Sequence, residues 1–135
     1  MIDTLKSYED ERGCLVPIEF NKLPFTPKRI FVITNVPKNI IRGNHAHYKT
    51  KQLLICINGK VDVILNDGNS ETITLLKKND SLLIDNLIWD SQKFLTESTE
   101  LLVLCSTEFD IDDYIMDFDK FKKIKLNEES TDNGN

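Results

Sequence analysis

The sequence predicts an all-β domain, a sandwich or a barrel, and three observations support this. Its apolar runs are short and rich in Val, Ile, Leu and Thr. These runs recur about every ten residues with turn residues between them, as in antiparallel sandwiches and barrels. No helical pattern separates them, although the crossovers of a parallel sheet would require one. The length of 135 residues fits one domain with one core.

The predicted strands follow one another along the chain in six runs. They are residues 29–34, 52–57, 60–65, 71–75, 81–84 and 100–105. Asn58-Gly59 is typical of a two-residue hairpin turn, and residues 66–69 indicate a longer turn. Residues 15–20 are also apolar and strand-like, and pairing such a strand would remove an unprotected sheet edge.

The C-terminal part has a different pattern. Apolar side chains between residues 111 and 123 recur at the spacing of a short amphipathic helix. Acidic residues lie at its start and lysines at its end, which suits the helix dipole. Residues 127–135 are polar without an apolar anchor and are predicted to be a disordered tail. The folded domain is therefore expected to span residues 1–126.

Composition narrows the class of protein. The net charge of −5 argues against a nucleic-acid-binding surface. No apolar run approaches the roughly 20 residues needed to span a bilayer, and the N-terminus lacks a signal-peptide pattern. A cytoplasmic protein is expected. The cysteines are odd in number and widely spaced, so no disulfide is predicted, and Cys56 and Cys105 are expected to be buried and inert.

The two histidines of the chain, His45 and His47, lie two residues apart. In a strand, residues i and i+2 point to the same face, so their imidazoles should project side by side. Imidazole titrates near neutral pH, and such a pair suits proton transfer or metal binding. Arg42 precedes them closely enough to line the same cavity.

Gly43-x-His45-x-His47, followed by Gln52 and Gly59, is similar to the first motif of the cupin jelly rolls. Metal-binding cupins carry Glu where this chain has Gln52, and a later histidine completes their metal site. Here Asp90 stands in the region expected to hold that histidine. A neutral amide is a poor ligand for a divalent cation, so no metal site is expected. Because Asp90 can serve as a third ligand, a metal-dependent cupin oxygenase remains an alternative.

A closer resemblance, to the nucleotide-sugar 3,4-ketoisomerases, covers about residues 8–123. It rests on Glu11-Arg12-Gly13-Cys14-Leu15, Lys28-Arg29-Ile30, the stretches 42–47, 52–59 and 63–68, Trp89, and the tail from Asp113-Tyr114-Ile115 to Phe121. It implies an all-β cupin jelly-roll barrel with a short C-terminal helix. It also implies a homodimer without cofactor or metal and without nucleic-acid or membrane partners.

The activity implied is conversion of dTDP-4-keto-6-deoxyglucose into a dTDP-3-keto-6-deoxyhexose with the galactose or glucose configuration. Such products lead to 3-amino-3,6-dideoxy sugars of surface glycans, such as lipopolysaccharide or S-layer glycans. A non-catalytic sugar-nucleotide-binding cupin and a dTDP-sugar 3,5-epimerase remain alternatives.

Moving the carbonyl requires one base to take the carbon-3 proton and a donor to stabilise the enediolate. His47 is assigned as that base slightly ahead of His45, to which the epimerase resemblance points. Asp90 is expected to orient an imidazole or accept a hydroxyl proton. Arg42 and Arg12 suit the diphosphate, because guanidinium groups bind it in a bidentate manner. The other predicted substrate-binding residues are Gln52, Asn44 and Trp89.

Each of these binding residues also has a plainer interpretation. Arg12 fits a solvated turn, Arg42 a surface ion pair and Gln52 an ordinary strand residue. One departure from the resembling enzymes concerns a tyrosine in the strand matching residues 29–34, where this chain has Phe31 and Val32. Tyr48 follows His47 directly and should point to the opposite face, so it is a poor substitute.

Overall fold

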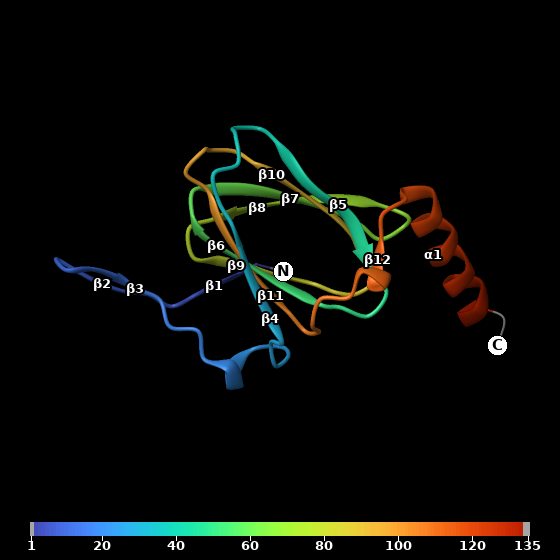
Figure 1. Cartoon of the computed structure of the whole chain (residues 1–135), viewed down its shortest axis with the longest axis horizontal. Helices are drawn as coiled ribbons and strands as arrows, with labels where there is room; N and C mark the ends of the chain where they lie inside the picture. Colours follow the sequence, from blue (N-terminus) through green and yellow to red (C-terminus); the bar gives the residue numbers. More distant parts are fainter. Residues whose placement is uncertain (1, 134–135) are drawn as a thin grey trace.

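The computed structural model describes residues 2–133, and two five-stranded antiparallel sheets form its barrel (Figure 1). The first sheet has the order β1 (Ile2–Thr4), β9 (Asp80–Ile84), β6 (Gln52–Asn58), β11 (Glu100–Cys105) and β4 (Arg29–Ile33). The second has the order β12 (Tyr114–Ile115), β5 (Ile41–His47), β10 (Trp89–Phe94), β7 (Lys60–Asn66) and β8 (Glu71–Lys77). The all-β prediction is confirmed, and all six predicted strands are present.

Side-chain alternation explains how the sheets close around one core. In β7, Val61 and Val63 are fully buried while Asp62 between them is not, which is the period-two pattern of a strand with one buried face. The main cluster lies between the two sheets. It comprises Val36, Leu54, Cys56, Val61, Val63, Leu76, Leu82, Ile84, Phe94, Leu101, Val103 and Cys105. The expected burial of Cys56 and Cys105 is confirmed, and all three cysteines are free.

Asn58-Gly59 does not form the predicted hairpin. β6 and β7 flank Gly59 but belong to different sheets, so the chain crosses from one sheet to the other there. Gly59 has φ +78°, and a Cβ at this position would lie 2.6 Å from Thr99 Cα. Only glycine fits such a conformation at such a close approach. The turn residue was recognised correctly, but the two strands that it joins do not pair.

The N-terminal segment differs from the single strand expected over residues 15–20. β2 (Tyr8–Asp10) and β3 (Gly13–Leu15) form a separate hairpin that extends away from the barrel (Figure 1). A 3₁₀ helix, η1 (Phe20–Lys22), follows. Apolar residues of this region then cover the outer face of the first sheet at Leu53, Ile55 and Leu104; they are Leu5, Ile18, Leu23 and Phe25.

The predicted helix over residues 111–123 is partly wrong. Its first part is a 3₁₀ turn, η2 (Ile111–Asp113), followed by β12, and α1 runs from Phe118 to Asn133. Asp117 Oδ1 accepts hydrogen bonds from the backbone N–H groups of Asp119 and Lys120, which fixes the start of α1.

The helix also extends through residues 127–133, where the sequence predicts a disordered tail, and residues 134–135 lie outside the described part. Within residues 2–133, no helix is long and apolar enough to cross a membrane.

Candidate active site

A cavity of about 340 Å³ lies between the two sheets, and its lining comes from β4, β6 and β11 of the first sheet and from β5, β10 and β12 of the second. Its polar lining consists of Arg29, Arg42, His45, Gln52, Gln92 and Tyr114. Its apolar lining consists of Phe31, Val32, Ile33, Leu54 and Val103, with Gly43 at the wall. Pockets of about this size, in which several polar groups converge between apolar walls, are typical of small-molecule sites.

A β-bulge on β5 brings Arg42 and His45 to the same cavity. Residues three apart in a regular strand point to opposite faces. Here His45 pairs with Asp90 and Gly43 pairs with Ser91, so Asn44 is the extra residue in the ladder. Gly43 and Asn44 both have positive φ, +91° and +59°. The bulge therefore turns Arg42 towards the side on which His45 lies.

His45 and His47 lie side by side, as predicted, with ring centroids 5.0 Å apart in an edge-on arrangement. His45 lines the cavity, whereas His47 lies behind it and is only 5% exposed. Burial, assisted by the neighbouring His47, lowers the pKa of His45 to about 4, and a hydrogen bond with the Gly43 backbone opposes that shift. His45 is therefore a neutral imidazole at physiological pH.

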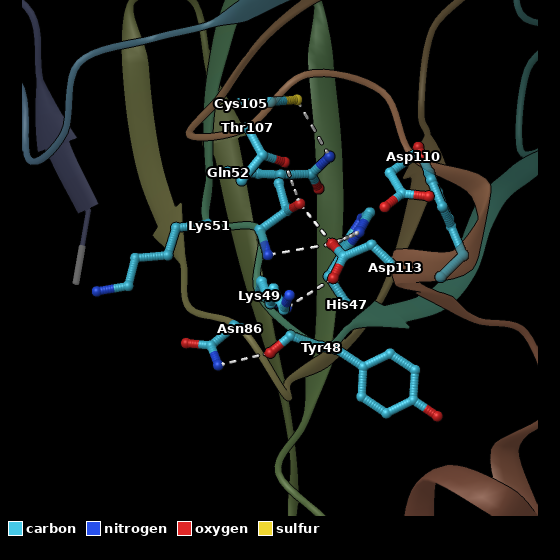
Figure 2. A network of polar contacts seen from close by, with 12 residues as sticks. His47, Tyr48, Lys49, Lys51, Gln52, Asn86, Cys105, Thr107, Asp110 and Asp113 are labelled. Carbon is cyan, nitrogen blue, oxygen red and sulfur yellow. Dashed lines mark hydrogen bonds and ion pairs between the residues drawn. The ribbon is translucent and has the colours of Figure 1, made fainter.

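His47 is held by a carboxylate from the other end of the chain. Its Nδ1 lies 3.3 Å from Oδ2 of Asp113, and Figure 2 shows the two groups facing each other. A carboxylate can only accept, so Nδ1 carries the proton and Nε2 is the free acceptor of the neutral ring. That Nε2 atom is buried without a hydrogen-bond partner. Burial lowers the pKa of His47, against the opposing effect of Asp113.

Asp113 is fixed by hydrogen bonds from the loop that follows β5. The Lys49 and Thr50 backbone N–H groups donate to it at 2.8 and 3.1 Å, and Thr50 Oγ1 donates at 2.5 Å (Figure 2). Thr50 Oγ1 also contacts Thr107 Oγ1 at 2.6 Å. Burial acts to raise the pKa of Asp113, but these donors outweigh it and keep that pKa below its usual value. Asp113 is thus an ionised anchor for His47.

Three polar cavity residues were not recognised from the sequence as site residues: Gln92, Tyr114 and Arg29. Tyr114 lines the cavity with its ring centroid 4.4 Å from that of His47 and 5.3 Å from that of His45. Arg29 donates from Nη1 to the Tyr114 hydroxyl at 3.3 Å. Tyr114 and Arg29 lay within motifs that carried the family resemblance, but Tyr114 was interpreted as an apolar position of a helix. The predicted opposite direction of Tyr48 is seen in Figure 2, and its ring packs with Ala46 and Phe121.

Asp90 is close to His45 in the ladder but does not line the cavity. It is 1% exposed, and its Oδ1 accepts a hydrogen bond from Gln92 Nε2. Its Oδ2 has no hydrogen-bond partner, and burial raises the pKa of Asp90 to about 7. Asp90 and Gln92 both pack against Gly43, where a Cβ would approach each to 3.2 Å. Asp90 thus orients Gln92, which does line the cavity.

Of the predicted substrate-binding residues, Arg42 and Gln52 line the cavity, and three others do not. Asn44 Oδ1 accepts a hydrogen bond from Ser91 Oγ at 2.7 Å. Trp89 packs against Phe118 and Phe121 of α1, with ring centroids 5.2 and 5.8 Å away. Arg12 lies on the projecting hairpin and pairs with Asp10 at 2.6 Å. The β-bulge explains why Asn44 lies outside the cavity, and packing against α1 explains why Trp89 does.

No group of three or more His, Cys, Asp and Glu side chains within residues 2–133 is arranged to hold a metal ion. Asp90, the candidate third ligand, binds Gln92 instead of converging with the two histidines. The donor set of the cavity consists of one imidazole, two guanidinium groups, two amides and a phenol. Guanidinium groups bind anions, so this cavity suits a negatively charged, hydroxylated ligand.

This fold and cavity define a small-molecule site in a cupin-type jelly-roll barrel. A family model described as "FdtA: WxcM-like, C-terminal" matches residues 1–126. The TDP-4-oxo-6-deoxy-alpha-D-glucose-3,4-oxoisomerase of Aneurinibacillus thermoaerophilus is 40% identical over 120 residues, which cover 87% of this chain and 86% of that protein. The chain belongs to the FdtA family of WxcM-like proteins.

Solved structures agree with this assignment. QdtA, a sugar 3,4-ketoisomerase from Thermoanaerobacterium thermosaccharolyticum in complex with TDP, is 37% identical with a TM-score of 0.89, over 95% of each chain. A histidine-to-asparagine mutant of QdtA, in complex with TDP-4-keto-6-deoxyglucose, gives 37% identity and a TM-score of 0.87, over 93% of this chain and 92% of that one.

Proposed function

We propose that this chain is a sugar 3,4-ketoisomerase that converts dTDP-4-keto-6-deoxyglucose into a dTDP-3-keto-6-deoxyhexose. The observation that carries the proposal is the cavity itself, in which a neutral imidazole, His45, lies beside two guanidinium groups. The identity to named 3,4-ketoisomerases over most of the chain supports the same reaction and substrate. The enzyme is an isomerase, and its reaction needs no net oxidant or reductant.

The reaction moves a proton from carbon 3 to carbon 4 through an enediolate. We assign the proton-accepting role to His45 ahead of His47, which reverses the order favoured by the sequence. His45 lines the cavity, whereas His47 is buried behind it with Asp113. A neutral base that touches the substrate can take the carbon-3 proton and return it to carbon 4. His47 is the positioning partner, packed edge-on against the His45 ring.

The diphosphate binds through Arg42 in this proposal. Arg42 is exposed at the cavity wall, where a large anionic group can remain partly in solvent. Charge-assisted hydrogen bonds from guanidinium to phosphate are among the strongest in proteins. Gln52 and Gln92 provide amide groups to the sugar hydroxyls from deeper in the cavity, where both side chains are buried.

We further propose that the enzyme is a homodimer. β4 is the edge strand of the first sheet, and Ile30 and Val32 on it are 51% and 56% exposed, although Val32 also borders the cavity. An uncovered apolar edge strand is prone to pair with another chain. The β2–β3 hairpin projects from the same end of the chain and carries Arg12 (Figure 1). In a dimer that hairpin can deliver Arg12 to the partner's cavity, which would restore its predicted role with the diphosphate.

The product is a 3-keto sugar nucleotide, and an amino-transfer reaction at carbon 3 would consume it. We therefore keep the role in making 3-amino-3,6-dideoxy sugars for surface glycans such as lipopolysaccharide or S-layer glycans. We propose a cytoplasmic enzyme, because all three cysteines are free and two of them are buried thiols. Free thiols are usual in a reducing compartment.

The test is incubation with dTDP-4-keto-6-deoxyglucose in deuterated water, followed by NMR of the sugar. A 3-keto product with deuterium at carbon 4 supports the proposal and reports the configuration there. Exchange at carbons 3 and 5 with retention of the 4-keto group would indicate a 3,5-epimerase instead. Binding of dTDP without turnover would indicate a non-catalytic module. Turnover that requires a divalent ion found by elemental analysis, and consumes oxygen, would indicate a cupin oxygenase.

A further inference from the structure

The reaction needs a second proton path, between the two oxygens of the sugar. When the carbonyl moves from carbon 4 to carbon 3, the oxygen on carbon 4 gains a proton and the oxygen on carbon 3 loses one. An imidazole that handles the carbon-bound proton cannot carry both. β4 offers no hydroxyl for this purpose, because Phe31 lines the cavity there and Thr34, which follows the strand, is not among the lining residues.

We propose that Tyr114 is the group that transfers this oxygen-bound proton, positioned by Arg29. This inference rests on the proposed ketoisomerase function. Tyr114 is the one phenol among the side chains that line the cavity, and the residues involved all belong to the described part of the chain. It supplies from β12 the hydroxyl that β4 lacks.

The strand pairing places Tyr114 beside the histidines. In the β12–β5 ladder Tyr114 is the direct partner of His47. The phenol ring lies against both imidazoles, at 4.4 Å from His47 and 5.3 Å from His45 between centroids. Its neighbour Asp113 is fixed by hydrogen bonds to the loop after β5. The position of Tyr114 is therefore set from both sides.

Arg29 determines what the phenol oxygen can do. Its Nη1 donates to Tyr114 Oη, so one lone pair of that oxygen is occupied and the phenolic proton is free for another acceptor. The guanidinium group lies over two rings, 4.7 Å from the centroid of Phe31 and 4.9 Å from that of Phe109. Such contacts hold a guanidinium plane in place. A cation beside the oxygen also stabilises a phenolate that forms transiently.

The reaction consists of two paired proton transfers. His45 takes the proton from carbon 3 while Tyr114 gives its phenolic proton to the oxygen on carbon 4, which leaves an enediol and a tyrosinate beside Arg29. The tyrosinate then takes the proton from the hydroxyl on carbon 3 while His45 returns its proton to carbon 4. The carbonyl now lies on carbon 3, and both side chains have regained their starting protonation.

The test compares the isomerisation rate of Tyr114→Phe with that of the parent protein, with Tyr48→Phe as a matched control. Both variants remove one phenolic oxygen, but Tyr48 points away from the histidines. We expect kcat of Tyr114→Phe to fall by about 10²–10⁴-fold. The KM, and the dTDP affinity measured by calorimetry, should stay within about threefold of the parent if binding depends on other groups.

A rescue variant separates a chemical role from a structural one. Phe31 lines the same cavity and contacts the same Arg29 guanidinium group. Adding Phe31→Tyr to Tyr114→Phe restores a phenol to the cavity. We expect kcat of this double variant to be about tenfold or more above that of Tyr114→Phe alone. Recovery supports a proton-transfer role, because a merely structural loss at Tyr114 would not be repaired by a hydroxyl supplied to the cavity from another strand.

Arg29→Gln tests the positioning role, since the double variant with Tyr114→Phe should be no slower than Tyr114→Phe alone. A parental kcat in Tyr114→Phe would overturn the proposal, and so would an equal loss in Tyr48→Phe. Loss of kcat without any recovery from Phe31→Tyr, together with independent effects of Arg29→Gln, would overturn it as well. Absence of isomerisation by the parent protein would contradict the proposed function itself. The activity of the parent is therefore measured before the variants are compared.

Discussion

Asp90 and His45 are direct partners across the β10–β5 ladder, but only His45 lines the cavity. The side chain of Asp90 is enclosed by protein, and one of its oxygens has no hydrogen-bond partner. Burial raises the pKa of Asp90 to about 7 and lowers that of His45 to about 4. Two neighbouring groups therefore both favour their neutral forms, because each charged form would be poorly solvated.

The stability of the protein should depend on pH through the protonation of Asp90. Its folded pKa of about 7 lies above the ordinary value of 3.8, so its contribution is complete below about pH 4 and is lost as the pH rises through 7. Asp90→Asn removes this term with little change of shape. The melting temperature of the variant relative to the parent should thus increase between pH 4 and 7 and level off above.

The variant must be compared with the parent at each pH, because His45 changes the stability with pH in the opposite direction to Asp90. Its folded pKa of about 4 lies below the ordinary 6.5, so its contribution is present above pH 6.5 and is lost as the pH falls through 4. Taking the difference between the two proteins cancels the His45 term. A difference in melting temperature that does not vary with pH would contradict a protonated Asp90.

Exchange of the carbon-bound proton should distinguish the two histidines. His45→Asn is expected to reduce exchange of the carbon-3 proton by about 10²–10⁴-fold, since asparagine cannot act as a base. His47→Asn should retain more exchange, because His47 lies behind His45. Both rates are measured by NMR in deuterated water. A larger loss in His47→Asn than in His45→Asn would restore His47 as the base.

Removal of the Asp113 carboxylate should impair catalysis without impairing binding. Asp113→Asn replaces an acceptor facing His47 Nδ1 by a group that can donate, which removes the preference for the Nδ1–H tautomer. A loss of kcat of about 10-fold to 10³-fold with unchanged dTDP affinity is expected. Asp112→Asn is the matched control, since Asp112 is exposed one residue earlier. Equal kcat losses in the two variants would refute a specific role of Asp113.

Nucleotide affinity should depend on Arg42. Each charge-assisted hydrogen bond lost in Arg42→Ala is worth roughly 1.5–3 kcal/mol, which corresponds to about a tenfold to hundredfold weaker binding. The affinity of the parent should also fall as salt is added. Calorimetry with dTDP provides both measurements, and Lys38→Ala removes an exposed cation from the preceding turn as a control. Unchanged affinity in Arg42→Ala would remove Arg42 from the site.

The proposed dimer can be tested at its apolar edge. Val32→Glu places a charge on the exposed face of β4 and should convert the protein to the 15.6 kDa monomer in sedimentation equilibrium. Ile73→Glu on β8 changes an apolar residue of the opposite sheet that is still more exposed, 66% against 56% for Val32, and should leave the assembly intact. A parent protein that sediments only as a monomer at micromolar concentration would rule out the dimer.

The strands could be predicted from the sequence because they are short apolar runs separated by turn residues, which is a local pattern. His45 and His47 could be placed side by side because residues two apart in a strand point to the same face. The course of the chain after Asn58-Gly59 could not be predicted, since a glycine turn has the same local sequence pattern whether the two strands it joins pair or belong to different sheets. The contact of Asp113 with His47 could not be predicted either, because His47 lies 66 residues earlier and no local sequence pattern indicates that the two side chains meet.

The extra residue at Asn44 has a consequence for how mutations in this segment would act. Side chains of a regular strand point alternately to its two faces. A change of one residue in length therefore normally moves every side chain on one side of the change to the opposite face. Asn44 is an exception, because it is the residue that the ladder already leaves unpaired. Its deletion would place Arg42 two residues before His45 in a regular strand, and therefore on the same face. The positions of β5 before the histidines would thus keep their faces, and the deletion would remove only the hydrogen bond from Ser91 to Asn44 and the local bend of the strand.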